Sequence, residues 1–257
     1  MSKLTKKQIA DHNIAVELLK KDSLTFEEKL IVYEKWNESA NSLNSEAGAF
    51  FTPIDLARDF SLQIYEGAKI VDMCAGIGML SFFAYHYNKC TDITCVELNP
   101  QYVEVGKKLL PEAKWICGSI FDFEQLEHYD QAIGNPPFGK IKTGISTSSK
   151  LKYKGSEFDL ITIEIASLIA DCGAFIVPQM STPFRYSGCH FFEDLRENSK
   201  GYNPYERSLP QKVQKFINET KLNYEFNIGI DTSVYINQWK GVSPMCEIIT
   251  FDFTDKK

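Results

Sequence analysis

Short apolar runs alternate with helical segments in the middle of the chain, and this alternation constrains the fold more than any other feature. Each run has the length of a strand, and each intervening segment carries apolar residues at helical spacing. The predicted strands are Lys69–Met73, Ile93–Glu97, Trp115–Cys117, Gln131–Gly134 and Ala174–Pro178. The predicted helices are Met79–Tyr87, Gln101–Leu110 and Glu157–Asp171. Such alternation indicates an α/β fold in which helices cover both faces of a mainly parallel sheet.

The N-terminal part is predicted to be a helical extension over residues 1–45, followed by a main domain over residues 46–257. The first predicted helix spans Lys6–Lys20, and the second opens with the capping box of Thr25 and Glu28. Asn37–Ser45 is rich in Asn, Ser and Glu, which is typical of a linker.

Two further elements are predicted in the main domain. Thr52 is expected to cap a helix that has Pro53 at its first position and ends at Gly67. Tyr224–Ile230 and Cys246–Phe253 are β-rich runs, and we expect them to form an antiparallel pair at the edge of the sheet. With this pair the sheet has seven strands.

Composition and charge exclude several classes of protein. With 44% hydrophobic and 24% charged residues, the chain is neither disordered nor collagen-like. It lacks an apolar run long enough for a membrane span and an apolar region typical of a secretory signal, so a cytoplasmic location is expected. The seven cysteines are scattered and predict neither a disulfide framework nor a metal site. A net charge of −6 argues against indiscriminate coating of nucleic acid but allows a local basic patch.

A small-residue loop follows the first predicted strand. It runs from Asp72 through Cys74, Ala75, Gly76 and Gly78, and Glu97 ends the next strand 25 positions after Asp72. Glycines there let the backbone approach a ligand, and an acid at the second strand can bind ribose hydroxyls. The third glycine of a dinucleotide motif is replaced by Ser81. An acid beside the loop suits a cationic, phosphate-free nucleoside such as S-adenosylmethionine; a plain turn and a nicotinamide site remain alternatives.

The turn Asn135-Pro136-Pro137-Phe138 follows the fourth predicted strand, at the edge where open α/β sheets bind ligands. The prolines fix the backbone and remove donors, so that carbonyl oxygens remain as acceptors. The Asn135 side chain offers another acceptor and Phe138 a flat face. This combination suits an amino group on a planar ring, whereas the alternative is a structural turn with Phe138 in the core.

Along the chain, Phe50-Phe51-Thr52-Pro53 precedes the loop after Asp72, Glu97 and the Asn135 turn. In this order the motifs resemble the class I, Rossmann-like amino-methyltransferases, specifically the adenine-N6 DNA methyltransferases, over about residues 49–178. The resemblance implies that S-adenosylmethionine is the cofactor and that Asn135, Pro136, Pro137 and Phe138 hold the target base. It also implies cofactor contacts whose members are Phe51, Thr52, Pro53, Asp72, Cys74, Ala75, Gly76, Gly78, Glu97, Leu98, Ser119 and Ile120. Family members commonly have an acid after the glycine of the third strand, but Ser119 follows Gly118 here.

The resemblance implies methyl transfer to N6 of an adenine flipped out of duplex DNA, and no metal is needed. Structured RNA, a protein glutamine amide, and a catalytically silent subunit are the alternatives. The sequence leaves open whether a specificity partner or a homodimer is needed, and whether the protein serves restriction-modification or a phage system. Five lysines after the turn are predicted to contact phosphates, or else form a solvated surface: Lys140, Lys142, Lys150, Lys152 and Lys154. Thr182–Pro210 mixes basic and aromatic residues and is either a second contact segment or a packing loop.

Overall fold

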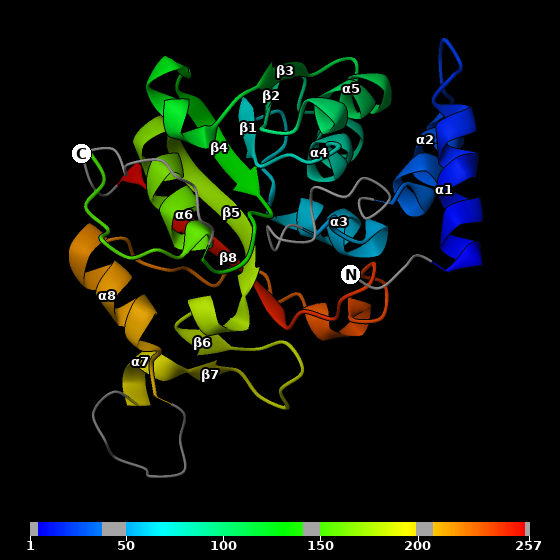
Figure 1. Cartoon of the computed structure of the whole chain (residues 1–257). Coiled ribbons are helices and arrows are strands. Elements are labelled where there is room, and N and C mark those ends of the chain that lie inside the picture. The colour runs from blue at the N-terminus through cyan, green and yellow to red at the C-terminus, as the bar shows by residue number, and fades with distance from the viewer. Residues whose placement is uncertain (1–4, 38–49, 141–149, 199–207, 255–257) are drawn as a thin grey trace.

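The computed structural model describes residues 5–37, 50–140, 150–198 and 208–254. Its main sheet has six strands in the order β3-β2-β1-β4-β5-β8 (Figure 1). The strands are β1 (Ile70–Met73), β2 (Ile93–Glu97), β3 (Lys114–Cys117), β4 (Tyr129–Gly134), β5 (Ala170–Pro178) and β8 (Cys246–Asp252). The first five are parallel and β8 pairs antiparallel with β5. A mainly parallel α/β sheet is therefore confirmed.

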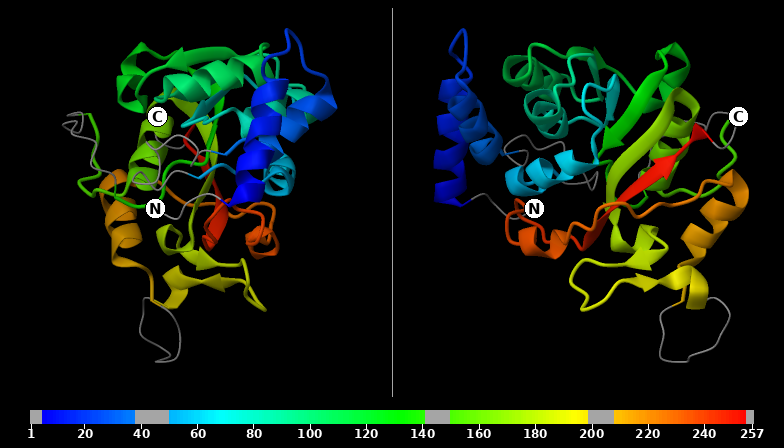
Figure 2. Two further views of the ribbon diagram at one scale, coloured as in Figure 1. Left: turned by 45° about the vertical axis from the view of Figure 1, so that its right-hand side comes forward. Right: turned by 180° about the vertical axis from the view of Figure 1, so that it is seen from behind.

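Helices cover both faces of the sheet (Figures 1 and 2). One face packs against α3, α4 and α5, and the other packs against α6 and α8. The helices are α1 (Lys6–Leu18), α2 (Phe26–Lys35), α3 (Ile54–Phe60), α4 (Met79–Asn88), α5 (Pro100–Leu109), α6 (Phe158–Ile169), α7 (Leu195–Asn198) and α8 (Gln211–Thr220). The 3-10 helices are η2 (Ser61–Gln63), η3 (Ile120–Gln125), η4 (Gln179–Ser181) and η5 (Thr232–Tyr235). Among the described residues, no helix combines the length and apolar character that a membrane span requires.

The N-terminal helices pack into the same hydrophobic core as α3 to α5. The capping box predicted at α2 is present, with Thr25 Oγ1 accepting from the Glu28 backbone N–H at 3.3 Å. Val32, Tyr33 and Trp36 are buried on the side of α2 that faces the main domain. The predicted boundary between residues 45 and 46 lies outside the described residues.

The predicted strand over Tyr224–Ile230 is wrong, so the main sheet has six strands rather than seven within the described residues. Only a single antiparallel bridge, between Glu225 and Thr250, joins this segment to β8. The Phe226 ring instead packs on the rings of Phe184 and Tyr186, at centroid distances of 5.1 and 5.2 Å. The segment therefore leaves the sheet edge for the neighbouring hairpin, and β8 pairs with β5 instead.

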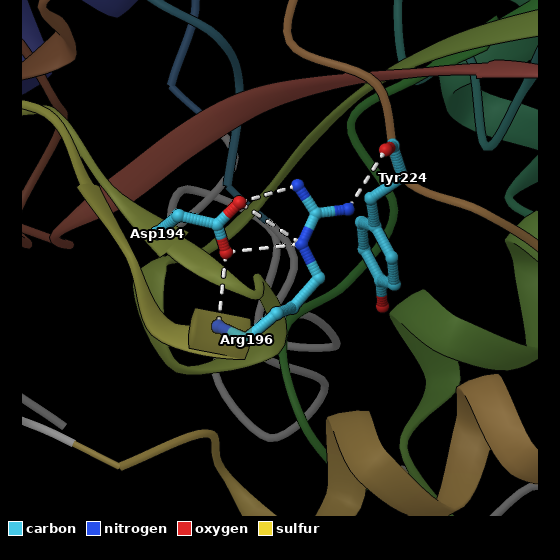
Figure 3. Close-up of polar contacts among 3 residues, drawn as sticks. All are labelled: Asp194, Arg196 and Tyr224. Atoms are coloured by element: carbon cyan, nitrogen blue, oxygen red, sulfur yellow. Dashed lines mark hydrogen bonds and ion pairs between the residues drawn. The ribbon is translucent and has the colours of Figure 1, made fainter. Parts of the chain in front are cut away.

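That hairpin consists of β6 (Phe184–Arg185) and β7 (Glu193–Asp194) and lies beyond the carboxyl end of β5 (Figure 1). Arg196 binds both carboxylate oxygens of Asp194 and donates to the Tyr224 carbonyl at 3.4 Å (Figure 3). Arg185 is buried, with a hydrogen bond to the Phe184 carbonyl. These two arginines of the segment Thr182–Pro210 therefore hold the chain together, whereas its other basic residues, Lys200 and Arg207, lie outside the described residues.

Candidate functional site

Three chain segments meet at the carboxyl edge of the parallel strands. They are the loop after β1, the end of β2 and the turn after β4, because β1 lies between β2 and β4 in the sheet. Asp72 on β1 pairs with Cys95 of β2 and Ile133 of β4. The end of β1 with its loop and the start of α4, the turn after β4, and the segment before α3 line one cavity: Phe50, Phe51, Thr52, Asp72, Cys74, Ala75, Gly76, Ile77, Met79, Leu80 and Asn135. Its volume is about 30 Å³, so a nucleoside-sized ligand requires the lining side chains to move apart.

The loop after β1 bends through left-handed backbone conformations. The φ angles are +63° at Cys74, +59° at Gly76 and +88° at Gly78, which caps α4. A Cβ at Gly76 would lie 3.0 Å from the Phe51 ring, and one at Gly78 would lie 3.0 Å from the Trp115 ring. Glycine therefore permits both the turn and the close aromatic packing.

The carboxyl group of Asp72 is buried beneath this loop, with only 1% of the residue exposed. Ser81 Oγ donates to Asp72 Oδ2 at 2.7 Å, whereas Oδ1 has no hydrogen-bond partner among the described residues. The pKa of Asp72 is raised to about 7, mainly by burial; the hydrogen bonds with Ser81 oppose this shift and the nearby Glu97 charge adds to it. A positively charged group at this site would satisfy Oδ1 and favour the ionised acid. Ser81, which replaces the third glycine of the dinucleotide motif, serves as the donor to Asp72.

Glu97 joins the end of β2 to the loop after β1. Its Oε2 accepts from the Gly76 backbone N–H at 2.8 Å, and its Oε1 accepts from the Asn99 backbone N–H at 2.7 Å. Burial raises the pKa of Glu97, while these backbone hydrogen bonds oppose the shift. Each carboxylate oxygen retains capacity for a further donor, such as a hydroxyl group.

The Asn135 side chain is oriented by two hydrogen bonds at the end of β4. Its Nδ2 donates to the Phe50 carbonyl and to Thr52 Oγ1, both at 3.0 Å. Within the described part of the chain, no donor bonds to Asn135 Oδ1, so this oxygen is held as a free acceptor. Gly134 allows the close approach of β1, because a Cβ there would lie 2.6 Å from the Met73 carbonyl oxygen.

This use of Thr52 corrects the expected start of α3. The helix has Pro53 at its N-cap and no side-chain capping bond, so Thr52 is not the cap. Its hydroxyl accepts from Asn135 instead, 83 positions along the chain. The local pattern predicted a capping role for Thr52 and did not indicate its long-range hydrogen bond with Asn135.

An aromatic wall borders the turn after β4. The Phe138 ring lies 6.4 Å from the Phe50 ring and 6.5 Å from the Trp239 ring, measured between centroids. Gly139, next in the chain, donates its backbone N–H to Asp159 Oδ1 at 3.4 Å. Phe138 is half-buried, so part of its ring remains available beside Asn135.

Six predicted cofactor residues do not line this cavity: Pro53, Gly78, Glu97, Leu98, Ser119 and Ile120. Leu98 is 71% exposed just after β2. Ser119 Oγ accepts from the Phe121 backbone N–H at 3.2 Å and so caps η3, whose first residue, Ile120, is buried. Neither Ser119 nor Ile120 lines the cavity, although both follow β3 at the same edge of the sheet.

The predicted phosphate-binding lysines are distributed around the segment after the turn. Lys140, Lys152 and Lys154 are exposed, and Lys150 forms an ion pair with Glu124 at 3.0 Å. The backbone N–H groups of Lys152 and Lys154 donate to Glu164 and Glu219, which fixes this part of the chain beside α6 and α8. Lys142 lies outside the described residues.

The sequence interpretation missed two residues at the end of α2 that support the loop after β1 and the segment before α3. The Tyr33 hydroxyl donates to the Gly78 carbonyl at 3.2 Å, and the Trp36 ring lies 5.5 Å from the Phe51 ring. Trp239 beside Phe138 was also missed. Their apolar character indicated core positions, but nothing in the local pattern paired them with the site.

Comparison with known proteins gives two curated relatives. No family model matches the chain. It is 28% identical over 174 residues to the type II methyltransferase M.BsuBI of Bacillus subtilis, covering 52% of this chain and 34% of the relative. It is 27% identical over 127 residues to the tRNA1(Val) (adenine(37)-N6)-methyltransferase of Aliivibrio fischeri (strain MJ11), covering 45% of this chain and 54% of the relative. The matches therefore span about half or less of each relative.

Solved structures show the same fold. The methyltransferase subunit of a type I restriction-modification system from Streptococcus thermophilus superimposes with a TM-score of 0.54 at 13% identity. The match covers 92% of this chain and 52% of that chain. The fold and the two relatives agree with the resemblance of the motifs to the class I S-adenosylmethionine-dependent methyltransferases.

Proposed function

We propose that this protein transfers a methyl group from S-adenosylmethionine to the exocyclic N6 of adenine in DNA, with the adenine flipped out of the duplex. The observation that carries the proposal is the orientation of Asn135. Both Nδ2 hydrogen bonds are made within the protein, and Oδ1 is left as an acceptor beside Phe138. The acids suited to a cationic nucleoside lie at the same edge of the sheet.

The residues around the glycine loop fit S-adenosylmethionine. The unpartnered Oδ1 of Asp72 would accept from the ammonium group of the cofactor, and its buried position would strengthen that interaction. Glu97 would accept from the ribose hydroxyls, and Phe51, Thr52 and Pro53 would enclose the methionine part. Cys74, Ala75, Gly76 and Gly78 would provide close backbone contacts. The bound cofactor supplies an electrophilic methyl group.

The turn after β4 would hold the target. Asn135 Oδ1 and the Pro136 carbonyl would accept the two amino protons, which directs the nitrogen lone pair toward the methyl group. Pro137 would fix the backbone of the turn, and Phe138 would stack on the base. Most of the rate enhancement would then come from positioning rather than from proton abstraction.

Duplex DNA is the preferred substrate because the match to the type II methyltransferase is the longer of the two, at 174 against 127 residues. Structured RNA is the second candidate, since the other relative is named as a tRNA adenine-N6 methyltransferase. In either polymer, Lys140, Lys142, Lys150, Lys152 and Lys154 would contact phosphates. Leu98, Ser119 and Ile120 would flank the adenine of the cofactor.

A labelling experiment tests this proposal. The protein is incubated with methyl-labelled S-adenosylmethionine and, separately, duplex DNA, total tRNA, ribosomal RNA or total protein. Label in DNA that digestion and chromatography identify as N6-methyladenine is the expected result, and Asn135→Ala should lower its rate by about a hundredfold or more. Label in RNA alone would favour the second candidate. Label in protein alone, or none in any polymer, would refute the proposal.

A further inference from the structure

Trp239 is a buried side chain beside the proposed target-base site whose polar atom has no partner. The residue follows η5 and is 5% exposed, and its ring centroid lies 6.5 Å from that of Phe138 with the ring planes at 58°. Its indole Nε1–H makes no hydrogen bond to any residue that the structure describes. Buried donors without acceptors are uncommon in native proteins, so each one calls for a physical explanation.

The next residue holds Trp239 in this place. Lys240 Nζ donates to the backbone carbonyls of Tyr33 and Trp36 at the end of α2. These are carbonyls that the helix itself leaves without N–H partners, and a cation stabilises them. The chain at Trp239 is therefore tied to α2 on one side while its ring packs against Phe138 on the other.

The two prolines of the turn after β4 supply carbonyl acceptors and no donors. Pro136 and Pro137 have no backbone N–H, and both Nδ2 protons of Asn135 are already engaged. An adenine carries an amino group, which needs acceptors, and ring nitrogens, which need donors. Within the described part of the chain, Trp239 Nε1–H is a donor without a partner, on a ring that packs beside Phe138.

We propose that Trp239 binds the target base, with its ring forming a second aromatic wall beside Phe138 and its indole N–H donating to a ring nitrogen of that base. The inference rests on the proposed function, because it assumes that the base reaches the Asn135 turn. Trp239 would add a hydrogen-bond donor to the acceptors of Asn135 and Pro136. The site would then recognise both the amino group and a ring nitrogen of the base.

Two substitutions separate the N–H from the ring. Trp239→Phe retains an aromatic ring and removes the donor, whereas Trp239→Leu removes both. The matched control is Tyr129→Phe, since the Tyr129 hydroxyl is also buried without a partner but lies at the opposite end of β4. Each variant is measured for urea unfolding, for S-adenosylmethionine affinity by calorimetry, and for kcat and KM on the polymer that the wild type labels.

The expected result is specific to the nucleic acid. Trp239→Phe should unfold at the same urea concentration as the wild type or a higher one, and its cofactor affinity should stay within twofold. Its kcat/KM for nucleic acid should fall about tenfold, mainly through KM, which corresponds to the loss of one hydrogen bond. Trp239→Leu should lose about another tenfold or more through stacking. Tyr129→Phe should remain within twofold throughout.

Two results would overturn the assignment of Trp239. In the first, Trp239→Phe turns over nucleic acid within twofold of the wild type while Asn135→Ala is inactive. In the second, Trp239→Phe loses stability and cofactor affinity in parallel with turnover, which would make Trp239 a packing residue. A failure of the proposed function itself is distinguishable, because the wild type would then label no nucleic acid.

Discussion

Replacing Asp72 with asparagine should make the free protein more stable at pH 8 while weakening its binding to the cofactor. The reason is the burial of the carboxyl group, which raises its pKa from 3.8 to about 7. The folded protein therefore binds more protons at this group than the unfolded chain does between those values. The stability that protonated Asp72 contributes to the folded protein is fully present below pH 3.8 and is lost as the pH rises through 7.

The magnitude follows from the difference of about 3 between the two pKa values. At about 1.4 kcal/mol for each pH unit, the raised pKa of Asp72 lowers the free energy of unfolding, relative to its value below pH 3.8, by about 4 kcal/mol at pH 8 and by about 2 kcal/mol at pH 5. Asparagine does not ionise and can still accept from Ser81, but its amide N–H groups replace Oδ1 in a site without an acceptor, which costs about 1 to 3 kcal/mol. That cost is the same at every pH. The free energy of unfolding of the variant, relative to the wild type, should therefore rise by about 2 to 3 kcal/mol from pH 5 to pH 8.

Urea unfolding followed by circular dichroism at four pH values between 5 and 8 measures this difference directly. Asp22→Asn is the control, because Asp22 is exposed and its replacement should give no pH-dependent gain beyond a few tenths of a kcal/mol. A difference between Asp72→Asn and the wild type that is constant across this range would refute the reasoning from the buried acid.

The affinity of Asp72→Asn for the cofactor should fall, although its stability at pH 8 rises. Because the proposed ammonium contact requires ionised Asp72, wild-type affinity for S-adenosylmethionine should fall about tenfold for each pH unit below 7. The asparagine variant should bind about tenfold or more weakly at pH 7, with little change between pH 5.5 and 7. Calorimetry over this range distinguishes the two proteins. A wild-type affinity that is independent of pH would contradict the proposed role of Asp72.

Other substitutions test separate parts of the site. Glu97→Ala should weaken S-adenosylmethionine by about tenfold or more in calorimetry, and unchanged affinity in a folded variant would rule out its ribose contact. Asn135→Ala should reduce turnover by about two to three orders of magnitude with little change in cofactor affinity, and near-normal turnover would exclude its role as an acceptor. Tyr33→Phe removes the hydrogen bond to Gly78, so the free energy of unfolding in urea should fall by about 1 kcal/mol and the KM for the cofactor should rise severalfold. An unchanged KM would show that α2 does not support the loop after β1 in cofactor binding. Each lysine replaced by Ala should lower the slope of log affinity against log salt by about 0.9 on duplex DNA, and an unchanged slope would exclude phosphate contacts by Lys140, Lys142, Lys150, Lys152 and Lys154.

The α/β architecture was predictable because it depends on local patterns. The five parallel strands each lie within a few residues of their predicted positions, since an apolar run between turn residues identifies a buried strand without reference to its partners. The same holds for α4 and α5, whose starts are marked by Gly78 and by Asn99 with Pro100. The small-residue loop after β1 and the Asn135 turn after β4 were also identifiable, because their residue types restrict the backbone locally.

The wrong strand prediction concerns a segment that can pack against either of two surfaces, the edge of the sheet or the hairpin of β6 and β7. Tyr224–Ile230 has the alternation of a strand, but alternation does not specify which surface receives the apolar side chains. Gly229 approaches the Tyr186 ring so closely that a Cβ would lie 2.8 Å from it, and Phe226 joins the aromatic side chains of the hairpin. The packing of that hairpin therefore decided the path of the segment.

The sequence by itself determined the order of strands and helices along the chain and the residue types at the edge of the sheet. Tertiary structure alone decided how those residues act together. Asn135 is oriented by Phe50, 85 positions away, and Trp239 reaches Phe138 across about a hundred residues. A hydrogen bond acts over about 3 Å, so its partners are set by the folded paths of distant segments, which the local pattern of residues does not encode.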